Sequence, residues 1–237
     1  MTNQVKYHIG LLIYPGMTQL DITGPHQVFA MMPQTCVHLL WKTLQPVTSS
    51  EGMTILPTTS FENCPLLDVL CVPGGAMGQV EMMRDTEVLE FLRRQGKTAK
   101  YVTSVCTGSL ILAAAGLLQG YRAACHWAFR NQLAMLGVEV GTDRVVVDRD
   151  RITGGGVTAG IDFGLVVAAH LCGEETAKLI QLLLEYNPAP PFNSGSPENA
   201  GQALVEQVKK FGEQVIEASL AQTKETASTL SIPISNS

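Results

Sequence analysis

The chain has 237 residues, of which 46% are hydrophobic and 16% charged, and its net charge is −5 at neutral pH. This length fits one compact α/β domain with a small appendage. An acidic balance without a basic run gives no electrostatic basis for binding nucleic acid. The longest apolar stretch, residues 161–172, contains Asp162 and His170 and is too short to span a bilayer. Six scattered cysteines without zinc-type spacing, and no signal-peptide pattern, predict a cytoplasmic protein with reduced thiols.

The first half of the chain alternates apolar runs with helical patterns. Residues 8–14 and 36–43 predict buried strands, and between them Asp21 leads into a helix with Pro25 suited to its first turn. Residues 67–72 form a third apolar run, which ends in Pro73-Gly74-Gly75, and residues 85–98 predict a charged amphipathic helix.

The second half continues the alternation. Residues 101–105 predict a strand, and the helix that follows closes at Gly116. A short strand over residues 122–125 precedes a helix near His126, residues 145–152 form a hairpin with a charged tip, and a long helix opens near Thr158. Strands that alternate with helices predict a largely parallel sheet covered on both faces, which binds ligands at the carboxyl ends of its strands.

The C-terminal part has a different character. Residues 188–197 are rich in proline and glycine and predict an irregular surface strap. One helix is expected over residues 199–222, packed in cis or against a second subunit, and the last dozen residues are expected to be disordered. Its apolar face would consist of Ala203, Val205, Val208, Phe211, Val215 and Ile216.

Cys106 is the strongest candidate for chemistry. It stands where a β-branched strand turns into a helix, the position of a nucleophile elbow, where helix N–H groups and the helix dipole stabilise a thiolate. A buried structural cysteine is the alternative interpretation. Thr107 caps the helix or contacts substrate.

Three further groups follow strands and are candidates to meet Cys106. Asp21 is the candidate acid, although its pKa must be raised by burial and by the nearby sulfur before it can donate a proton at neutral pH. Gly74 and Gly75 offer backbone N–H groups to developing negative charge, or only form a tight turn. His126 and Trp127 line the pocket or simply pack as a satisfied imidazole and a buried ring.

Several of these segments resemble the DJ-1/PfpI superfamily. They are Val72-Pro73-Gly74-Gly75, Ser104-Val105-Cys106-Thr107-Gly108 and Ala124-Cys125-His126-Trp127. More narrowly, residues 19–26, 154–162 and 181–192 resemble the isocyanide (isonitrile) hydratase branch. The resemblance implies a flavodoxin-like three-layer sandwich over residues 1–197, followed by a C-terminal helix and tail over 198–237. It also implies a homodimer with active sites near the interface, and no metal or organic cofactor.

The same resemblance implies that Cys106 is the nucleophile and Asp21 its acidic partner. A thiolate would attack the isocyanide carbon, Asp21 would protonate it to a thioimidate, and water would release an N-substituted formamide. Proteolysis is disfavoured because Thr107 stands where the protease branch has histidine. A second difference is that Asp21 stands where the DJ-1-like branch has glutamate.

Three alternatives remain open at this point. The first is a non-catalytic small-molecule sensor related to AraC-type regulators, although the tail shows no basic recognition helix. The second is a redox or stress-response protein in which Cys106 is oxidised to a sulfinate. The third is a glyoxalase-like or amidase-like activity of the same thiolate.

Overall fold

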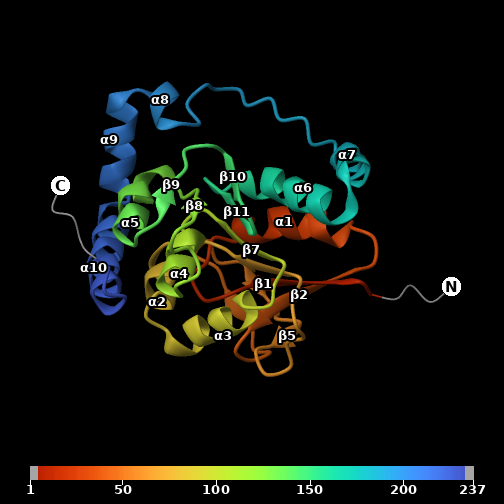
Figure 1. The fold of residues 1–237 in the computed structure, drawn as a ribbon. Helices are drawn as coiled ribbons and strands as arrows, with labels where there is room; N and C mark the ends of the chain where they lie inside the picture. Colours follow the sequence, from red (N-terminus) through yellow and green to blue (C-terminus); the bar gives the residue numbers. More distant parts are fainter. Residues whose placement is uncertain (1–4, 233–237) are drawn as a thin grey trace.

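A seven-stranded sheet lies at the centre of the protein, and the strand order is β10-β11-β7-β6-β1-β2-β5 (Figure 1). The computed structural model describes residues 5–232. All neighbouring strands are parallel except the hairpin of β10 and β11 at one edge. The strands of this sheet are β1 (Tyr7–Leu12), β2 (Thr35–Trp41), β5 (Thr59–Ser60), β6 (Val69–Val72), β7 (Tyr101–Val105), β10 (Val145–Asp148) and β11 (Arg151–Gly154).

Helices cover both faces of this sheet, as Figure 1 shows. On one face α1 contacts β1 and β2 and α6 contacts β10 and β11, whereas on the other face α3 contacts β6 and α4 contacts β6 and β7. The α/β three-layer sandwich is therefore confirmed. The helices are α1 (Leu20–Ala30), α2 (Met77–Met82), α3 (Thr86–Gly96), α4 (Gly108–Ala114), the 3-10 turn η1 (Trp127–Phe129), α5 (Arg130–Met135), α6 (Ala159–Cys172), α7 (Glu174–Leu183), α8 (Pro197–Ala200), α9 (Gln202–Phe211) and α10 (Glu213–Thr229).

The central strand β6 is apolar along its whole length because both faces of the sheet are covered there. Every residue of β6 is buried, as expected for a parallel strand between two helical layers. Short two-stranded ribbons lie outside the main sheet, and the sequence patterns did not predict them in full. They pair β3 (Val47–Thr48) with β4 (Thr54–Ile55) and β8 (Arg122–Ala123) with β9 (Glu139–Val140).

Local capping explains where the amphipathic helix begins. The Asp85 carboxylate accepts a hydrogen bond from the Val88 N–H at 3.1 Å, which satisfies one free amide of α3. The prediction for the helix over residues 85–98 is confirmed. The expectation that Pro25 lies in a first helical turn is wrong, because α1 begins at Leu20 and the proline falls in its second turn. There it removes the N–H that would bond the Asp21 carbonyl.

The C-terminal segment differs most from its prediction. The single helix expected over residues 199–222 is broken at Gly201, which has a φ of 80°, and again at Gly212. The disorder expected for the last dozen residues is wrong as far as the structure describes them, because α10 continues to Thr229. Residues 233–237 lie outside the described part. The irregular strap over 188–197 is confirmed up to the start of α8.

The two long tail helices have different environments. α10 packs in cis against α2, α4 and α5, and its buried Ser219 donates a hydrogen bond to Gln132 Oε1 at 2.6 Å. α9 buries none of its residues, and the Phe211 ring at its end is 95% exposed. The division of the chain into a domain over residues 1–197 and a C-terminal segment over 198–237 stays a prediction. Among the described residues, no helix combines the length and the apolar character needed to cross a membrane.

Candidate active site

Three loops meet at the carboxyl ends of the adjacent strands β1, β6 and β7. The loop after β1 and the loop after β6 are joined by an antiparallel bridge between Met17 and Gly75 and by the Thr18 N–H, which donates to the Gly74 carbonyl at 3.0 Å. β1 and β6 are neighbours in the sheet. After β1 the chain adds β2 and β5 on one side of β1, and from β6 onward it adds strands on the other side. This is the switch point where open α/β sheets bind their ligands.

Cys106 occupies a sharp turn between β7 and α4. Its φ is +59°, a left-handed conformation that non-glycine residues adopt rarely and mostly where the surrounding structure imposes it. Its N–H donates to the Gly154 carbonyl at 3.1 Å, which fixes the turn to β11. The predicted elbow geometry is confirmed. The residue is 6% exposed, so the sulfur lies at the bottom of the loops rather than on an open surface.

Asp21, in the first turn of α1, is completely buried. Its Oδ2 accepts a hydrogen bond from the Gly74 N–H at 2.8 Å, whereas its Oδ1 has no hydrogen-bond partner among the described residues. Burial raises the pKa of this carboxyl to about 7, although the Gly74 N–H and the neighbouring Cys106 thiol lower the pKa in opposition. The expectation that burial raises the pKa of Asp21 is confirmed, whereas the expectation that the nearby sulfur also raises it is wrong, because the Cys106 thiol lowers this pKa.

The pKa of the Cys106 thiol is raised, whereas the elbow alone predicts a lowered pKa. Burial is the main cause that raises the pKa of Cys106, with the negative charge of Asp21 as a second cause, and the hydrogen bonds from Thr107 only partly oppose this. The expectation of a thiolate stabilised by the helix is therefore wrong for this structure, because burial and the charge of Asp21 raise the pKa of Cys106 more than its hydrogen bonds lower it. A second negative charge is strongly disfavoured, so the Cys106–Asp21 pair shares its protons as one unit.

Thr107 does not cap its helix with its side chain. Its hydroxyl instead bonds the loop after β6, where Oγ1 accepts from the Gly75 N–H at 3.1 Å and lies 3.2 Å from the Gly75 carbonyl. The prediction of a side-chain cap is wrong because this buried loop amide needs a partner.

Gly74 and Gly75 therefore bring their neighbours into position. The expectation that their N–H groups are offered to developing negative charge is wrong for this structure, because the N–H of Gly74 is bonded to Asp21 and that of Gly75 to Thr107. A Cβ on Gly74 would lie 2.6 Å from the Thr107 Oγ1 and 2.9 Å from the Asp21 Oδ2. Glycine is needed here because no side chain fits between these two groups.

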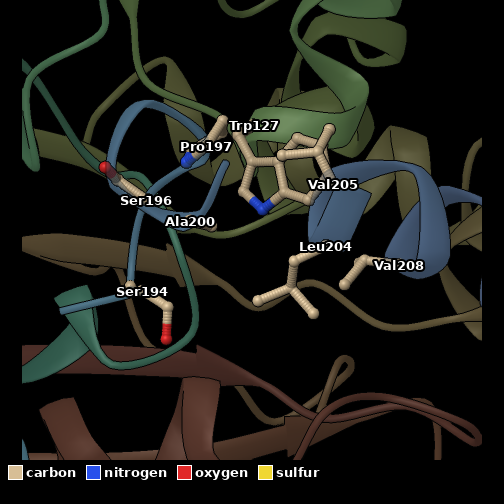
Figure 2. A pocket seen from close by; sticks show the side chains of 9 residues that line it. Trp127, Ser194, Ser196, Pro197, Ala200, Leu204, Val205 and Val208 are labelled. Atoms are coloured by element: carbon tan, nitrogen blue, oxygen red, sulfur yellow. The ribbon is translucent and has the colours of Figure 1, made fainter. Parts of the chain in front are cut away.

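His126 and Trp127 extend from the same region toward the C-terminal segment. The His126 N–H points at the Cys106 carbonyl at 3.4 Å, and its Nδ1 accepts from the Ala128 N–H at 3.4 Å. Burial lowers the pKa of His126, which keeps the imidazole neutral. Figure 2 shows the Trp127 indole beside α9. Trp127 borders a cleft of about 90 Å³. The cleft is lined by Trp127, Ser194, Gly195, Ser196, Pro197, Ala200, Leu204, Val205 and Val208.

Sequence reasoning missed two residues near the pair. Tyr14 is fully buried and donates its hydroxyl hydrogen to the Pro73 carbonyl at 3.0 Å, and the charges of Asp21 and Cys106 add to burial in raising its pKa. Glu51 accepts from the Gln19 N–H at 3.3 Å, and its negative charge contributes to the raised pKa of Asp21. Tyr14 is the last residue of the apolar run over residues 8–14, a signal that could have marked it. Glu51 lies in a loop without a motif.

The family follows from these segments taken together. Residues 8–170, which contain the loops with Asp21, Gly74 and Cys106, match the DJ-1/PfpI family. The chain belongs to the DJ-1/PfpI family. Within this family, the chain is 57% identical over 202 residues to an isonitrile hydratase of Pseudomonas putida. These residues make up 85% of this chain and 88% of that protein.

Other relatives differ in how much of their own length matches this chain. The HTH-type transcriptional regulator GbdR of Pseudomonas aeruginosa is 33% identical over 181 residues, which make up 73% of this chain but 48% of that regulator. A THiJ/PfpI family protein from Pseudomonas syringae superposes with a TM-score of 0.90 at 44% identity, covering 93% of this chain and 92% of that one. Drosophila melanogaster DJ-1beta superposes with a TM-score of 0.71 at 23% identity, over 76% and 98% of the two chains, and shares the fold.

Proposed function

We propose that this protein is an isonitrile hydratase, which converts an isocyanide and water to an N-substituted formamide. The observation that carries the proposal is the 57% identity to the Pseudomonas putida isonitrile hydratase over 85% of this chain. The pairing of a buried thiol with a carboxyl whose pKa is about 7 supports it, since the reaction needs a nucleophile and a proton donor together.

The first step joins sulfur and a proton to the same carbon. An isocyanide carbon accepts a nucleophile and a proton. The pair starts with one proton, held on the Cys106 sulfur; as the C–S bond forms, this proton passes to Asp21, which delivers it to the carbon. The product is a thioimidate on Cys106, and Asp21 is left as a carboxylate. Because the pair shares one proton before the attack, no isolated thiolate is required, and the high pKa of Cys106 is compatible with this step.

The second step releases the formamide. Asp21 takes a proton from water as the hydroxide adds to the thioimidate carbon, and it then returns a proton to the substrate nitrogen. Collapse of this adduct breaks the C–S bond, moves the hydroxyl proton to Asp21 and restores the starting pair. The Asp21 Oδ1, which has no partner among the described residues, is the oxygen we assign to these proton transfers.

The neighbouring residues have supporting roles in this proposal. Thr107, through its bonds to Gly75, holds the loop beside Cys106, and Gly74 orients the acid. His126 and Trp127 are proposed to border the substrate, because His126 adjoins the Cys106 backbone. The isocyanide carbon ends a linear group, which suits the narrow exposure of the sulfur. The proposal uses no metal or organic cofactor.

Turnover of cyclohexyl isocyanide to N-cyclohexylformamide, followed by mass spectrometry, tests the proposal. The wild-type protein should turn over, and Cys106→Ser should lose turnover and form no thioimidate adduct. Cys172→Ser is the matched control, because Cys172 is a half-buried thiol at the end of α6 and should leave the rate unchanged. Absence of turnover with several alkyl and aryl isocyanides would refute the proposal.

A ligand-sensing role is the second candidate, and the 33% identity to the regulator GbdR is the observation that favours it. A sensor would bind an isocyanide reversibly, without a formamide product and without dependence on the acid. Calorimetric titration of Asp21→Asn with the isocyanide therefore separates the two roles.

Peroxide treatment followed by intact-mass measurement tests the redox alternative. This alternative requires oxidation of Cys106 to be faster than isocyanide turnover.

We further propose a cytoplasmic homodimer. All six cysteines are free, as is usual in a reducing compartment. Large apolar side chains remain exposed on α7 and α9, including Leu182 at 78% and Phe211 at 95%, and a second copy would cover such a face. Light scattering of the full chain should give twice the monomer mass. Leu182→Asp and Phe211→Asp, measured in the same way, identify the helix that forms the interface.

A further inference from the structure

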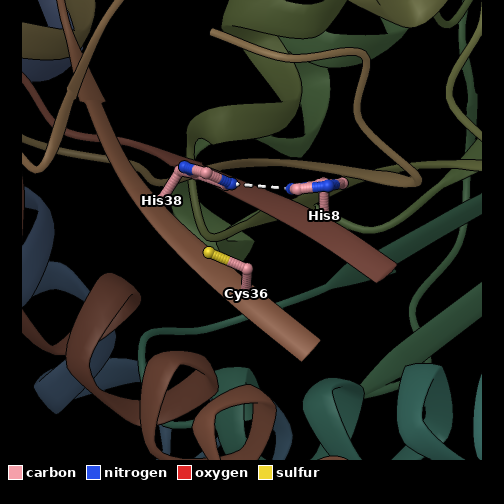
Figure 3. A group of neighbouring side chains, drawn as sticks. All are labelled: His8, Cys36 and His38. Atoms are coloured by element: carbon pink, nitrogen blue, oxygen red, sulfur yellow. Dashed lines mark hydrogen bonds between the residues drawn. The ribbon is translucent and has the colours of Figure 1, made fainter. Parts of the chain in front are cut away.

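Two histidines and a cysteine meet at the end of the sheet away from Cys106. His8 is the second residue of β1, and Cys36 and His38 lie on the neighbouring strand β2. The register pairs His8 with Cys36 and Gly10 with His38. Paired residues in adjacent strands, and residues two apart in one strand, point to the same face of a sheet. The backbone therefore brings the three side chains together, as Figure 3 shows.

Their donor atoms are close enough to share one ion. The His8 Nδ1 lies 3.0 Å from the His38 Nε2, and one ring nitrogen of each histidine and the Cys36 sulfur all lie within 4.8 Å of one another. Around tetrahedral zinc, bond lengths of about 2.0 Å to nitrogen and 2.3 Å to sulfur separate two nitrogens by about 3.3 Å and a nitrogen from a sulfur by about 3.6 Å. Small side-chain rotations reach these values.

The surroundings orient the imidazoles as a metal site requires. The His38 Nδ1 lies 2.9 Å from the Thr59 Oγ1 on β5. If this nitrogen carries the hydrogen, the Nε2 presents its lone pair to His8, which is the arrangement that outer hydrogen bonds impose on metal-binding histidines. The His8 backbone is held by its N–H, which donates to the Asp68 Oδ2 at 2.9 Å. All three side chains are half-buried, so an ion can enter from solvent.

We propose that His8, Cys36 and His38 form a binding site for a borderline-soft divalent ion, Zn²⁺, with water in the fourth position. Two imidazoles and a thiolate are ligands that zinc prefers over the oxygen ligands of calcium or magnesium. The ion ties β1 to β2 at the amino-terminal ends of the strands, whereas the candidate active site lies at their carboxyl ends. This inference is independent of the proposed hydratase activity.

The first test measures Zn²⁺ binding by competition with a chromogenic chelator. The Cys106→Ser variant is the starting protein, because it lacks the thiol of the candidate active site, which could otherwise bind the added zinc. It should bind one zinc per chain. Adding Cys36→Ser or His38→Ala should weaken the affinity by more than about 100-fold, and Thr59→Val by about 10-fold, since outer-shell changes cost 10–100-fold. Cys172→Ser is the matched control and should have no effect.

The second test uses Co²⁺ and needs no substitution in the cluster. The Cys106→Ser protein should show a thiolate-to-cobalt charge-transfer band and a tetrahedral visible spectrum, and zinc should displace both. Zinc should also raise the melting temperature, because an ion that binds only the folded state stabilises it. Undetectable binding at micromolar zinc, or binding that survives Cys36→Ser and His38→Ala in folded variants, would show that His8 and His38 are only a hydrogen-bonded pair.

Discussion

The Asp21 carboxyl and the Gly74 amide are joined by a 2.8 Å hydrogen bond, which ties the first turn of α1 to the loop after β6. The next residue, Gly75, donates to Thr107 beside Cys106. One short loop therefore sets the position of the candidate acid and of the elbow at the same time. Changes in this loop should affect both groups together.

Replacing the acid tests its chemical role. Asp21→Asn keeps an oxygen that accepts the Gly74 N–H, so the fold should persist, but it removes the exchangeable proton. General acid–base groups contribute about 10²–10⁴-fold to rates, and kcat with cyclohexyl isocyanide should fall by at least about 100-fold. Circular dichroism checks the fold. A variant with nearly normal kcat would remove Asp21 from the mechanism.

The raised pKa of Asp21 predicts a pH dependence of stability. Its pKa is about 7 in the folded chain and 3.8 in the unfolded chain, so between these values the folded state binds more protons. The free energy of unfolding should therefore decrease as pH rises from about 4 to about 7, by about 4 kcal/mol at most. Asp21→Asn should flatten this slope. Urea unfolding of both proteins across this range measures it, and equal slopes would contradict the prediction.

Thr107 tests whether its bond to Gly75 matters. Thr107→Val keeps the shape but leaves the buried Gly75 N–H without its partner, which should cost about 1–3 kcal/mol of unfolding free energy. Turnover should also decrease, because the loop no longer holds its position. Thr107→Ser restores a hydroxyl and should recover most of both quantities. Loss of turnover in the serine variant as well would point to a need for the methyl group instead.

Gly74→Ala tests the space between the acid and the elbow. The added Cβ would lie 2.6 Å from the Thr107 Oγ1, so the Thr107 and Asp21 side chains must shift and kcat should decrease at least tenfold. Gly156→Ala is a suitable control, because no atom lies within 4 Å of a Cβ placed there. Steady-state kinetics of the two variants gives the comparison, and equal rates would contradict the crowding.

The C-terminal helix provides a test of packing. Ser219→Ala removes the 2.6 Å hydrogen bond to the buried Gln132 Oε1, which should lower the unfolding free energy by about 1–2 kcal/mol. Ser228→Ala, on the exposed side of the same helix, should have little effect. Thermal unfolding measures both. If the two variants melt at the same temperature, the hydrogen bond between Ser219 and Gln132 does not contribute to the stability of the folded chain.

Much of the site was predictable because its signals are local. A β-branched strand that stops at Cys106 and is followed by Gly108 specifies the elbow within a few residues. Asp21 and Gly74 follow apolar runs, and parallel strands bring their carboxyl ends to one edge. The family resemblance over residues 8–170 is confirmed for the same reason, since these segments are continuous in the sequence.

Other features depend on contacts between distant segments. Thr107 could cap its own helix, but the buried Gly75 amide from another loop takes its hydroxyl. The tail helix breaks where Gly201 adopts a positive φ, although its apolar spacing continues through the break. The juxtaposition of His8 with His38 depends on the register of two strands, which the spacing of single residues does not reveal.

By itself, the sequence determined the alternation of the main strands and helices, the elbow at Cys106 and the presence of an acid at Asp21. Only the tertiary structure decided the pKa shifts of that pair, because burial is the largest cause that raises the pKa of both groups. Local geometry is encoded by neighbouring residues. The cost of a buried charge is decided by every segment that excludes water from it.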